Sequence, residues 1–127
     1  MERVASYDIR LSFSVMHMVF YRLGDDIVAL LAGGEREHIG SAVLALPRPS
    51  LRGDGTLSST SSVLNVPGHK DEALCRLVAD YLSSRLGCRV AVTGGFHSDN
   101  LSSSQIEETV TAVKESLQPI SRLLSQV

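Results

Sequence analysis

The fold of this chain is decided by one nearly continuous apolar run, Asp26-Ile27-Val28-Ala29-Leu30-Leu31-Ala32 (26–32), which follows a turn at Gly24-Asp25 and ends at Gly33-Gly34. Such a run is typical of a strand that is covered on both faces, so it predicts a central strand of a sheet. Immediately upstream, the side chains from Ile9 to Tyr21 alternate with a period of two. This period predicts a long half-buried strand, or a hairpin folded from it.

Downstream of the central run, the sequence predicts two shorter strands separated by a loop. The apolar residues 41–46 form the first of them, and Pro47 and Pro49 close it. Residues 50–62 are rich in Gly, Ser, Thr and Arg and carry little hydrophobicity, so we expect a loop there. Residues 63–66 then form a short fourth strand.

After residue 68 the apolar residues recur at three- and four-residue spacing, which is typical of helices. This spacing predicts a helix over about 69–86, with Gly87 at its C-cap. Residues 89–93 follow as a strand that ends at Gly94-Gly95. A second amphipathic helix is marked by Ile106, Val110, Val113, Leu117, Ile120 and Leu124.

Two local signals bear on this second helix. Ser104 and Glu107 have the spacing of a capping box. Pro119 removes a backbone donor and clashes with the preceding turn, so we expect a kink or a break near it. Strands first and helices later indicate an α+β fold, with a mixed, mainly antiparallel sheet of about five strands packed by two helices from the C-terminal half.

The composition favours one soluble domain over residues 1–127. The 127 residues are 43% hydrophobic and 20% charged, and a chain of this size buries roughly two-thirds of its surface on folding. No stretch approaches the length of a membrane span, and no apolar segment resembles a secretory signal, so we expect a cytoplasmic protein with no membrane partner. Cys75 and Cys88 lack CxxC spacing, which predicts two thiols rather than a disulfide or a metal site.

Charge and aromatic content argue against nucleic acid as a partner. The formal net charge is −2, and the basic residues are spread among acidic ones rather than gathered in a stripe. Phosphate-backbone binding needs such a basic stripe. The chain also has three Phe, three Tyr and no Trp, which leaves little surface for base stacking.

Polar residues gather in four segments at the ends of the apolar elements: 33–40, 58–62, 68–71 and 94–100. Glycine pairs let backbone N–H groups point into a cavity, and a helix that begins near residue 68 would add donors that favour an anion. The same tracts are also how strands ordinarily turn. The candidate cofactor-binding residues are Gly34, His38, Arg48, Ser59, Thr60, Ser61, Gly68, His69, Lys70, His97, Asp99 and Asn100.

Three histidines on separate segments, His38, His69 and His97, can converge on one metal ion or one titrating centre. Their spacing gives no geometric link among them. A fourth histidine, His17, falls on the apolar strand pattern and is interpreted as a core or partly exposed residue. Asp71 and Glu72 stand in the first turn of a predicted helix, where negative charge is stabilising without any catalytic role.

The five blocks 33–40, 45–50, 59–64, 67–71 and 95–100 stand in the same order as in the LpdD-like family, the prenylated-flavin chaperones, and the chain resembles that family over about residues 25–125. The resemblance implies a small helper protein that acts with a flavin prenyltransferase and a UbiD-type aromatic-acid decarboxylase. It implies prenylated FMN or FMN as the cofactor that is delivered or matured. A phosphate bound near Glu35-Arg36-Glu37 would depend on Arg36 to offset the two acids.

Together these observations favour a helper over an enzyme, with the flavin in a pocket lined by the polar segments. No nucleophile elbow, phosphate-binding loop or metalloprotease motif is present. One alternative is a metal-dependent hydrolase or lyase in which His38, His69 and His97 hold the metal and Asp99 is the base. Another is a structural subunit whose apolar strand face, near Met16, Met18 and Phe20, packs on a second copy or on the decarboxylase, which would make the chain a homo-oligomer or a fixed part of a complex.

Overall fold

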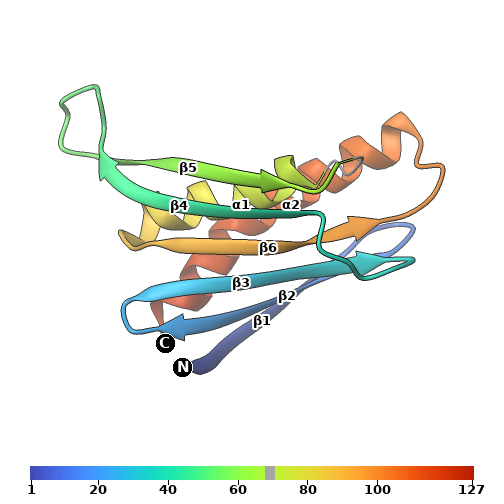
Figure 1. Cartoon of the computed structure of the whole chain (residues 1–127), viewed down its shortest axis with the longest axis horizontal. Coiled ribbons are helices and arrows are strands. Elements are labelled where there is room, and N and C mark those ends of the chain that lie inside the picture. Colours follow the sequence, from blue (N-terminus) through green and yellow to red (C-terminus); the bar gives the residue numbers. More distant parts are fainter. Residues whose placement is uncertain (68–70) are drawn as a thin grey trace.

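The computed structural model describes residues 1–67 and 71–127 and shows a six-stranded sheet with two helices (Figure 1). The spatial order of the strands is β1-β2-β3-β6-β4-β5, and every neighbouring pair is antiparallel except β3 and β6. The α+β prediction is confirmed, with six strands rather than about five. The elements are β1 (Glu2–Arg10), β2 (Val15–Leu23), β3 (Asp26–Gly34), β4 (Ser41–Pro49), β5 (Leu57–Asn65), α1 (Glu72–Leu86), β6 (Val90–His97) and α2 (Ser103–Ser125).

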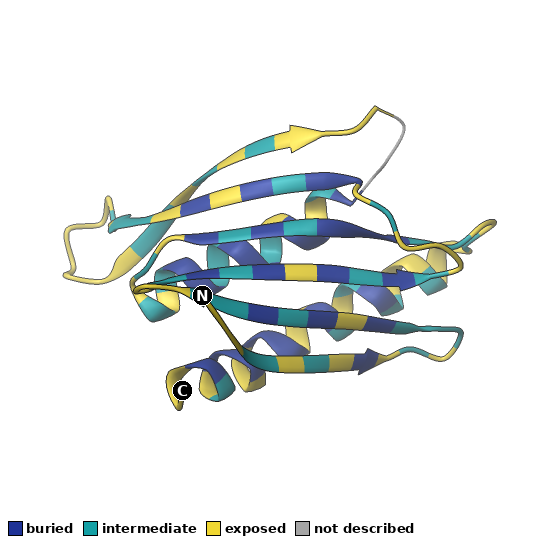
Figure 2. Ribbon diagram, turned by 60° about the horizontal axis from the view of Figure 1, so that its bottom comes forward, coloured by how far each residue is buried: buried dark blue, intermediate teal, exposed yellow. Residues whose placement is uncertain are grey.

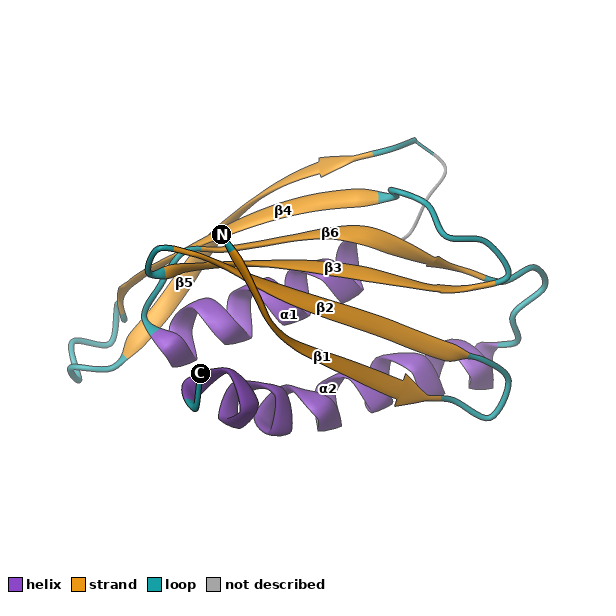
Figure 3. Ribbon diagram, turned by 90° about the horizontal axis from the view of Figure 1, so that it is seen from below, coloured by secondary structure: helices purple, strands orange, loops and turns teal. Residues whose placement is uncertain are grey.

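The molecule has two layers, because both helices lie on the same face of the sheet (Figure 3). The core between the layers is apolar: Met16, Met18 and Phe20 of β2 are fully buried, as are Val78 of α1 and Ile120 of α2. The prediction that Met16, Met18 and Phe20 lie near an outward-facing apolar surface is therefore wrong. Their alternation with Val15, His17 and Val19 was read correctly as a strand, but a period of two does not say which face a helix will cover.

The N-terminal alternation belongs to a hairpin rather than to one long strand. Leu11 N–H donates to the carbonyl of Ser14 across the turn, 2.8 Å away, and β1 then pairs with β2. The β1 strand begins at Glu2, ahead of the predicted alternation, and is the extra strand. It is an edge strand with several charged side chains, and such charges keep an edge from pairing with other chains. The same charges interrupt the apolar pattern by which a strand is predicted from sequence. His17 is exposed and lies 2.7 Å from Asp8.

The strand β3 is central in the sheet, as predicted, but it is covered on one face only. Ile27, Ala29 and Leu31 are buried, whereas Leu30 between them is 44% exposed. The interpretation as a strand covered on both faces is therefore wrong. The face of β3 turned away from the helices also carries apolar side chains.

The segment predicted to be a loop, residues 50–62, contains most of β5, which corrects that prediction. The β4 strand likewise runs on to Pro49 instead of ending at residue 46, and it stays paired with β5 up to Pro49 and Leu57. The pairing of β4 with its other neighbour, β6, ends at Ala45. Beyond Ala45, that side of β4 makes no hydrogen bonds to a neighbouring strand within the described residues. Prolines are tolerated in strands at such an edge.

The helices agree with the predicted periods, with changes at their ends. The α1 helix spans Glu72–Leu86 and ends on Gly87 in the left-handed conformation at φ 65°, as predicted. The capping box of α2 is formed by Ser102 and Gln105, not by Ser104 and Glu107, so that detail is wrong. The helix also continues through Pro119 without a break. Because Pro119 and Glu115 are both exposed, the carbonyl that loses its helical donor can bond to water.

Cys75 and Cys88 are both free thiols, as expected. Burial raises the pKa of the Cys75 thiol to about 12, so it stays protonated at neutral pH. Neither described helix is long and apolar enough to cross a membrane.

Candidate functional site

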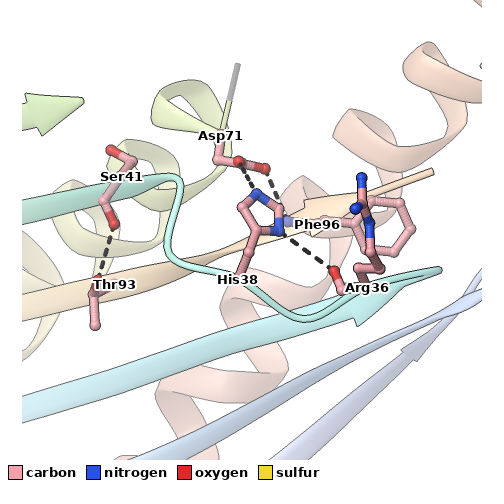
Figure 4. Close-up of polar contacts among 6 residues, drawn as sticks. All are labelled: Arg36, His38, Ser41, Asp71, Thr93 and Phe96. Carbon is pink, nitrogen blue, oxygen red and sulfur yellow. Dashed lines mark hydrogen bonds and ion pairs between the residues drawn. The ribbon is translucent and has the colours of Figure 1, made fainter. Parts of the chain in front are cut away.

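A buried histidine–aspartate pair lies at the end of the sheet where β3 and β6 finish (Figure 4). His38 stands in the connection between β3 and β4, and its Nε2 is 2.9 Å from Oδ2 of Asp71, which precedes α1. The other carboxylate oxygen of Asp71 accepts a hydrogen bond of 2.8 Å from the backbone N–H of Phe96. Nδ1 of His38 lies 3.3 Å from the carbonyl oxygen of Arg36. One carboxylate thus ties three segments of the chain together.

The chemistry of this pair is set by its acceptors. The Arg36 carbonyl and the Asp71 carboxylate both accept hydrogen bonds, so the ring donates through both nitrogens when it is protonated and through one when it is neutral. The side chains of His38 and Asp71 are only 19% and 7% exposed. Polar groups with so little access to water need hydrogen-bond partners within the protein, and both side chains have them here.

Two glycines make room for the pair. A Cβ atom on Gly40 would overlap Oδ2 of Asp71, and one on Gly95 would lie 2.5 Å from Nε2 of His38. Neither glycine has a positive φ, so the reason for glycine at both positions is space rather than backbone conformation. The strand was predicted to end at the Gly94-Gly95 doublet, but the doublet lies within β6. Gly95, the second residue of the doublet, leaves the space that the His38 ring occupies.

A second pair stands on the surface beside the first. Nε2 of His97, the last residue of β6, is 2.9 Å from Oδ1 of Asp99. The hydrogen bond from His97 holds the pKa of the Asp99 carboxyl below its ordinary value. The rings of His38 and His97 are perpendicular, with centroids 5.9 Å apart. Asn100, which follows, has a left-handed backbone at φ 57° and turns the chain toward α2.

A cleft of about 490 Å³ opens between the start of α1, the end of β6 and the start of α2. This volume lies within the range of roughly 300–1,000 Å³ that is usual for small-molecule sites. A smaller hollow of about 340 Å³ adjoins it, lined by Arg36, Glu37, His38 and His97, and His97 lines both. The cleft itself is lined by Asp71, Ala73, Leu74, Phe96, His97, Ser98, Asn100, Leu101, Ile106, Thr109 and Val110.

The predicted site residues fall into two groups rather than one. His97 and Asn100 line the cleft, His38 lines the adjoining hollow, and Asp99 bonds to His97. Gly34 pairs with His97 at the end of β3, where a Cβ atom would overlap the His97 carbonyl oxygen. Such a position, with φ 79°, requires glycine.

The second group lies on β4 and β5. The guanidinium Nε of Arg48 donates to Oγ1 of Thr60, 2.7 Å away, and Ser59 and Ser61 donate to Asp80 of α1. Arg48 is seven residues along β4 from Ser41, which is about 23 Å at the usual rise per strand residue. Arg48 therefore lies far along β4 from the His38 end of the sheet, and Ser59 and Ser61 are bonded to α1 instead. Gly68, His69 and Lys70 lie outside the described residues.

Metal binding was the alternative use of the histidines. Within residues 1–67 and 71–127, no group of three or more His, Cys, Asp or Glu side chains is placed to hold a metal ion. The predicted ligand set included His69, which is not among those residues. Of the three histidines, His38 and His97 each place Nε2 against a carboxylate instead.

Sequence reasoning missed Asp71, Gly40 and Gly95. Asp71 was interpreted only as a charge that stabilises the start of a helix, but it is 5% exposed and makes no side-chain capping bond. Its partners His38 and Phe96 are 33 and 25 residues away, so no local pattern could reveal them. The apolar lining residues Leu74, Ile106 and Val110 were visible as helical apolar positions and looked like ordinary core.

The fold resembles that of a solved structure. A chain from a novel chaperone complex for yeast 20S proteasome assembly superposes with a TM-score of 0.58 over 97% of this chain and 97% of that chain, at 14% identity. At that identity the likeness shows a shared two-layer α+β fold and nothing more.

The family follows from the sequence. The model of the prenylated flavin chaperone LpdD-like domain matches residues 12–125, so the chain belongs to this family. The resemblance deduced from the five ordered blocks is confirmed. No curated protein matches the chain.

Proposed function

We propose that this chain is a non-catalytic helper that holds prenylated FMN in the cleft beside the His38–Asp71 pair and passes it to, or matures it in, a UbiD-type aromatic-acid decarboxylase. Membership in the LpdD-like family supports a chaperone role for prenylated flavin. The flavin prenyltransferase and the decarboxylase are the proposed partners, and the cytoplasm is the proposed location. The observation that carries the proposal is the cleft, whose lining combines apolar side chains with His97, Ser98 and Asn100.

The lining suits a flat, largely apolar ring system. Leu74, Phe96, Leu101, Ile106 and Val110 supply apolar walls, and pockets for aromatic ligands are predominantly lined in this way. A prenylated isoalloxazine carries more apolar surface than an unmodified one, so it gains more from such walls. The proposal therefore expects tighter binding of prenylated FMN than of FMN.

The polar groups at the mouth can recognise the rest of the ligand. Ser98 and Asn100 offer hydroxyl and amide groups for the carbonyl and N–H edge of the ring. The adjoining hollow brings Arg36 together with His97, two donors suited to a phosphate once Glu37 is offset, whereas both ring nitrogens of His38 are already engaged. In this scheme the buried pair positions the mouth and does not react.

Equilibrium titration tests the proposal. Wild-type protein is titrated with FMN and with prenylated FMN under anaerobic conditions, and flavin fluorescence is followed. Ile106→Glu places a charge on an apolar wall and should weaken binding at least about tenfold, because an unpaired charge is costly against an apolar ligand. Leu51→Glu is the matched control: Leu51 is 92% exposed in the β4–β5 turn and should bind as wild type.

The same variants are then assayed for activation of apo-decarboxylase by prenylated FMN. The proposal expects Ile106→Glu to lose activation and Leu51→Glu to keep it. Wild-type protein that binds neither flavin, together with full activation by Ile106→Glu and by His38→Gln, would contradict it.

A further inference from the structure

Among residues 1–67 and 71–127, both helices lie on one face of the sheet and none lies on the other (Figure 3). We call the face without a helix the open face and define it by the strand residues that alternate with the buried core. On β3 these are Val28, Leu30 and Ala32, and on β4 they are Ala42, Leu44 and Leu46. Leu30, Leu44 and Leu46 are 44–47% exposed, which is unusual for leucines near the centre of a sheet. Figure 2 shows buried and more exposed residues alternating along the strands.

The open face carries a mainly apolar band over β2, β3, β6 and β4, interrupted by Thr93, and Leu64 extends it onto β5. In one row of the register, Val19 pairs with Leu30, Leu30 with Thr93, Thr93 with Ala42, and Ala42 with Leu64. In the next row, the chain of partners is Tyr21, Val28, Ala91, Leu44 and Ser62. These two rows hold no charged side chain between β2 and β5.

Polar residues border this band on both sides. On the β1 edge, Arg3 and Asp8 pair with the open-face residues Tyr21 and His17 of β2. On the β5 edge, the alternating positions that face outward include Thr60 and Ser62. An apolar centre with a polar rim is the usual anatomy of a protein–protein interface.

The size of the open face matches one side of a stable interface. Six strands about 4.8 Å apart and nine residues long at about 3.3 Å each give a face of roughly 29 by 30 Å, or about 850 Å². A standard interface buries about 800 Å² on each partner.

We infer that the open face is covered by the open face of a second copy of this chain, in a symmetric sheet-on-sheet dimer. Two twisted sheets pack face to face with strands about 30° apart and about 10 Å between layers, and a two-fold axis makes one apolar band complementary to itself. A helper that releases its client must also be stable without it. A second copy is always available as a cover, whereas a decarboxylase is not. The inference does not depend on flavin binding.

Sedimentation velocity of the full chain at micromolar concentration tests this inference. Wild type should sediment as a dimer of twice 13.7 kDa. Leu44→Glu puts a carboxylate from each copy into the apolar centre and should weaken dimerisation at least about 100-fold, giving a monomer. The matched control Leu51→Glu adds the same charge outside the sheet and should remain a dimer.

Two further measurements keep the test decisive. Circular dichroism should show that Leu44→Glu is folded, because its side chain is 47% exposed in one copy; if it does not fold, Leu64→Glu, at a position that is 78% exposed, replaces it. A wild-type monomer would overturn the inference, as would a dimer that survives either substitution in folded protein. A wild-type monomer that associates only with the decarboxylase would assign the open face to that enzyme instead. Loss of flavin binding by Ile106→Glu, with the dimer intact, would separate the two proposals.

Discussion

The His38–Asp71 and His97–Asp99 pairs have the same 2.9 Å distance between ring nitrogen and carboxylate oxygen, but they differ in burial. The first pair is 19% and 7% exposed, and the second is 29% and 65% exposed. Asp71 also accepts from a buried backbone N–H and joins segments far apart in sequence, whereas His97 and Asp99 are two residues apart.

The distance between the two atoms of a pair therefore does not measure how much the pair stabilises the fold. Removing one member of a buried pair takes a hydrogen-bonded partner away from groups that water reaches poorly, which is destabilising. An exposed pair is screened by water and salt and contributes little. We therefore expect His38–Asp71 to hold the end of the sheet together and His97–Asp99 to adjust only the surface of the cleft.

The largest effect should come from Asp71→Ala. It leaves the Phe96 N–H and the His38 ring without their carboxylate, which should cost about 2–4 kcal/mol and lower Tm by about 10 °C in a domain of this size. Asp71→Asn keeps an acceptor for the Phe96 N–H and should recover part of the loss. Thermal melts of both variants and of Asp99→Ala check the comparison, which fails if Asp71→Ala and Asp99→Ala melt together.

A middle-sized effect should come from Gly95→Ala. The new Cβ atom would lie 2.5 Å from His38 Nε2 and 2.9 Å from Asp71 Oδ2, so we expect a loss of about 1–3 kcal/mol from overpacking. Urea denaturation of Gly95→Ala in the wild-type and Asp71→Ala backgrounds gives the coupling between the positions. The cost should be smaller when Asp71 is already alanine, and an equal cost in both backgrounds would refute the steric explanation.

The smallest effect should come from Asp99→Asn, and it should depend on pH. The hydrogen bond from His97 lowers the pKa of Asp99 in the folded state from its ordinary 3.8. A lowered folded pKa stabilises the protein above the unfolded value, and that contribution is lost as pH falls through the folded pKa. The Tm of wild type should therefore exceed that of Asp99→Asn slightly at pH 6, and the gap should close below pH 3.8. A gap that widens on acidification would contradict the assignment.

Much of the fold could be predicted because its signals are local. The apolar run 26–32, the period of residues 73–86 and Gly87 each report their own surroundings, and the structure bears them out as β3, α1 and its C-cap. The edge strands β1 and β5 were missed or misplaced. Their charged and hydroxyl side chains resemble loop sequence, and only pairing with β2 and β4 makes them strands.

The candidate site was predictable only in part. His38, His97 and Asn100 stood out because their residue types carry chemistry, and the structure places His97 and Asn100 on the cleft and His38 on the adjoining hollow. Asp71 and Gly40 gain their meaning from a contact between segments about 30 residues apart, which neither period nor spacing encodes. The Ser-rich tract 58–62 was grouped with His38 and His97 on composition alone, and in the structure its Ser59 and Ser61 donate to Asp80 of α1.

The central claim, that the flavin occupies the cleft beside the buried pair, is tested most directly by mapping the contact on ¹⁵N-labelled protein titrated with FMN. The account predicts amide shifts concentrated at Phe96, Ser98, Leu101 and Ile106, with Thr60 and Ser61 unmoved. Shifts centred on the β4–β5 hydroxyls, or no shifts at saturating FMN, would contradict it.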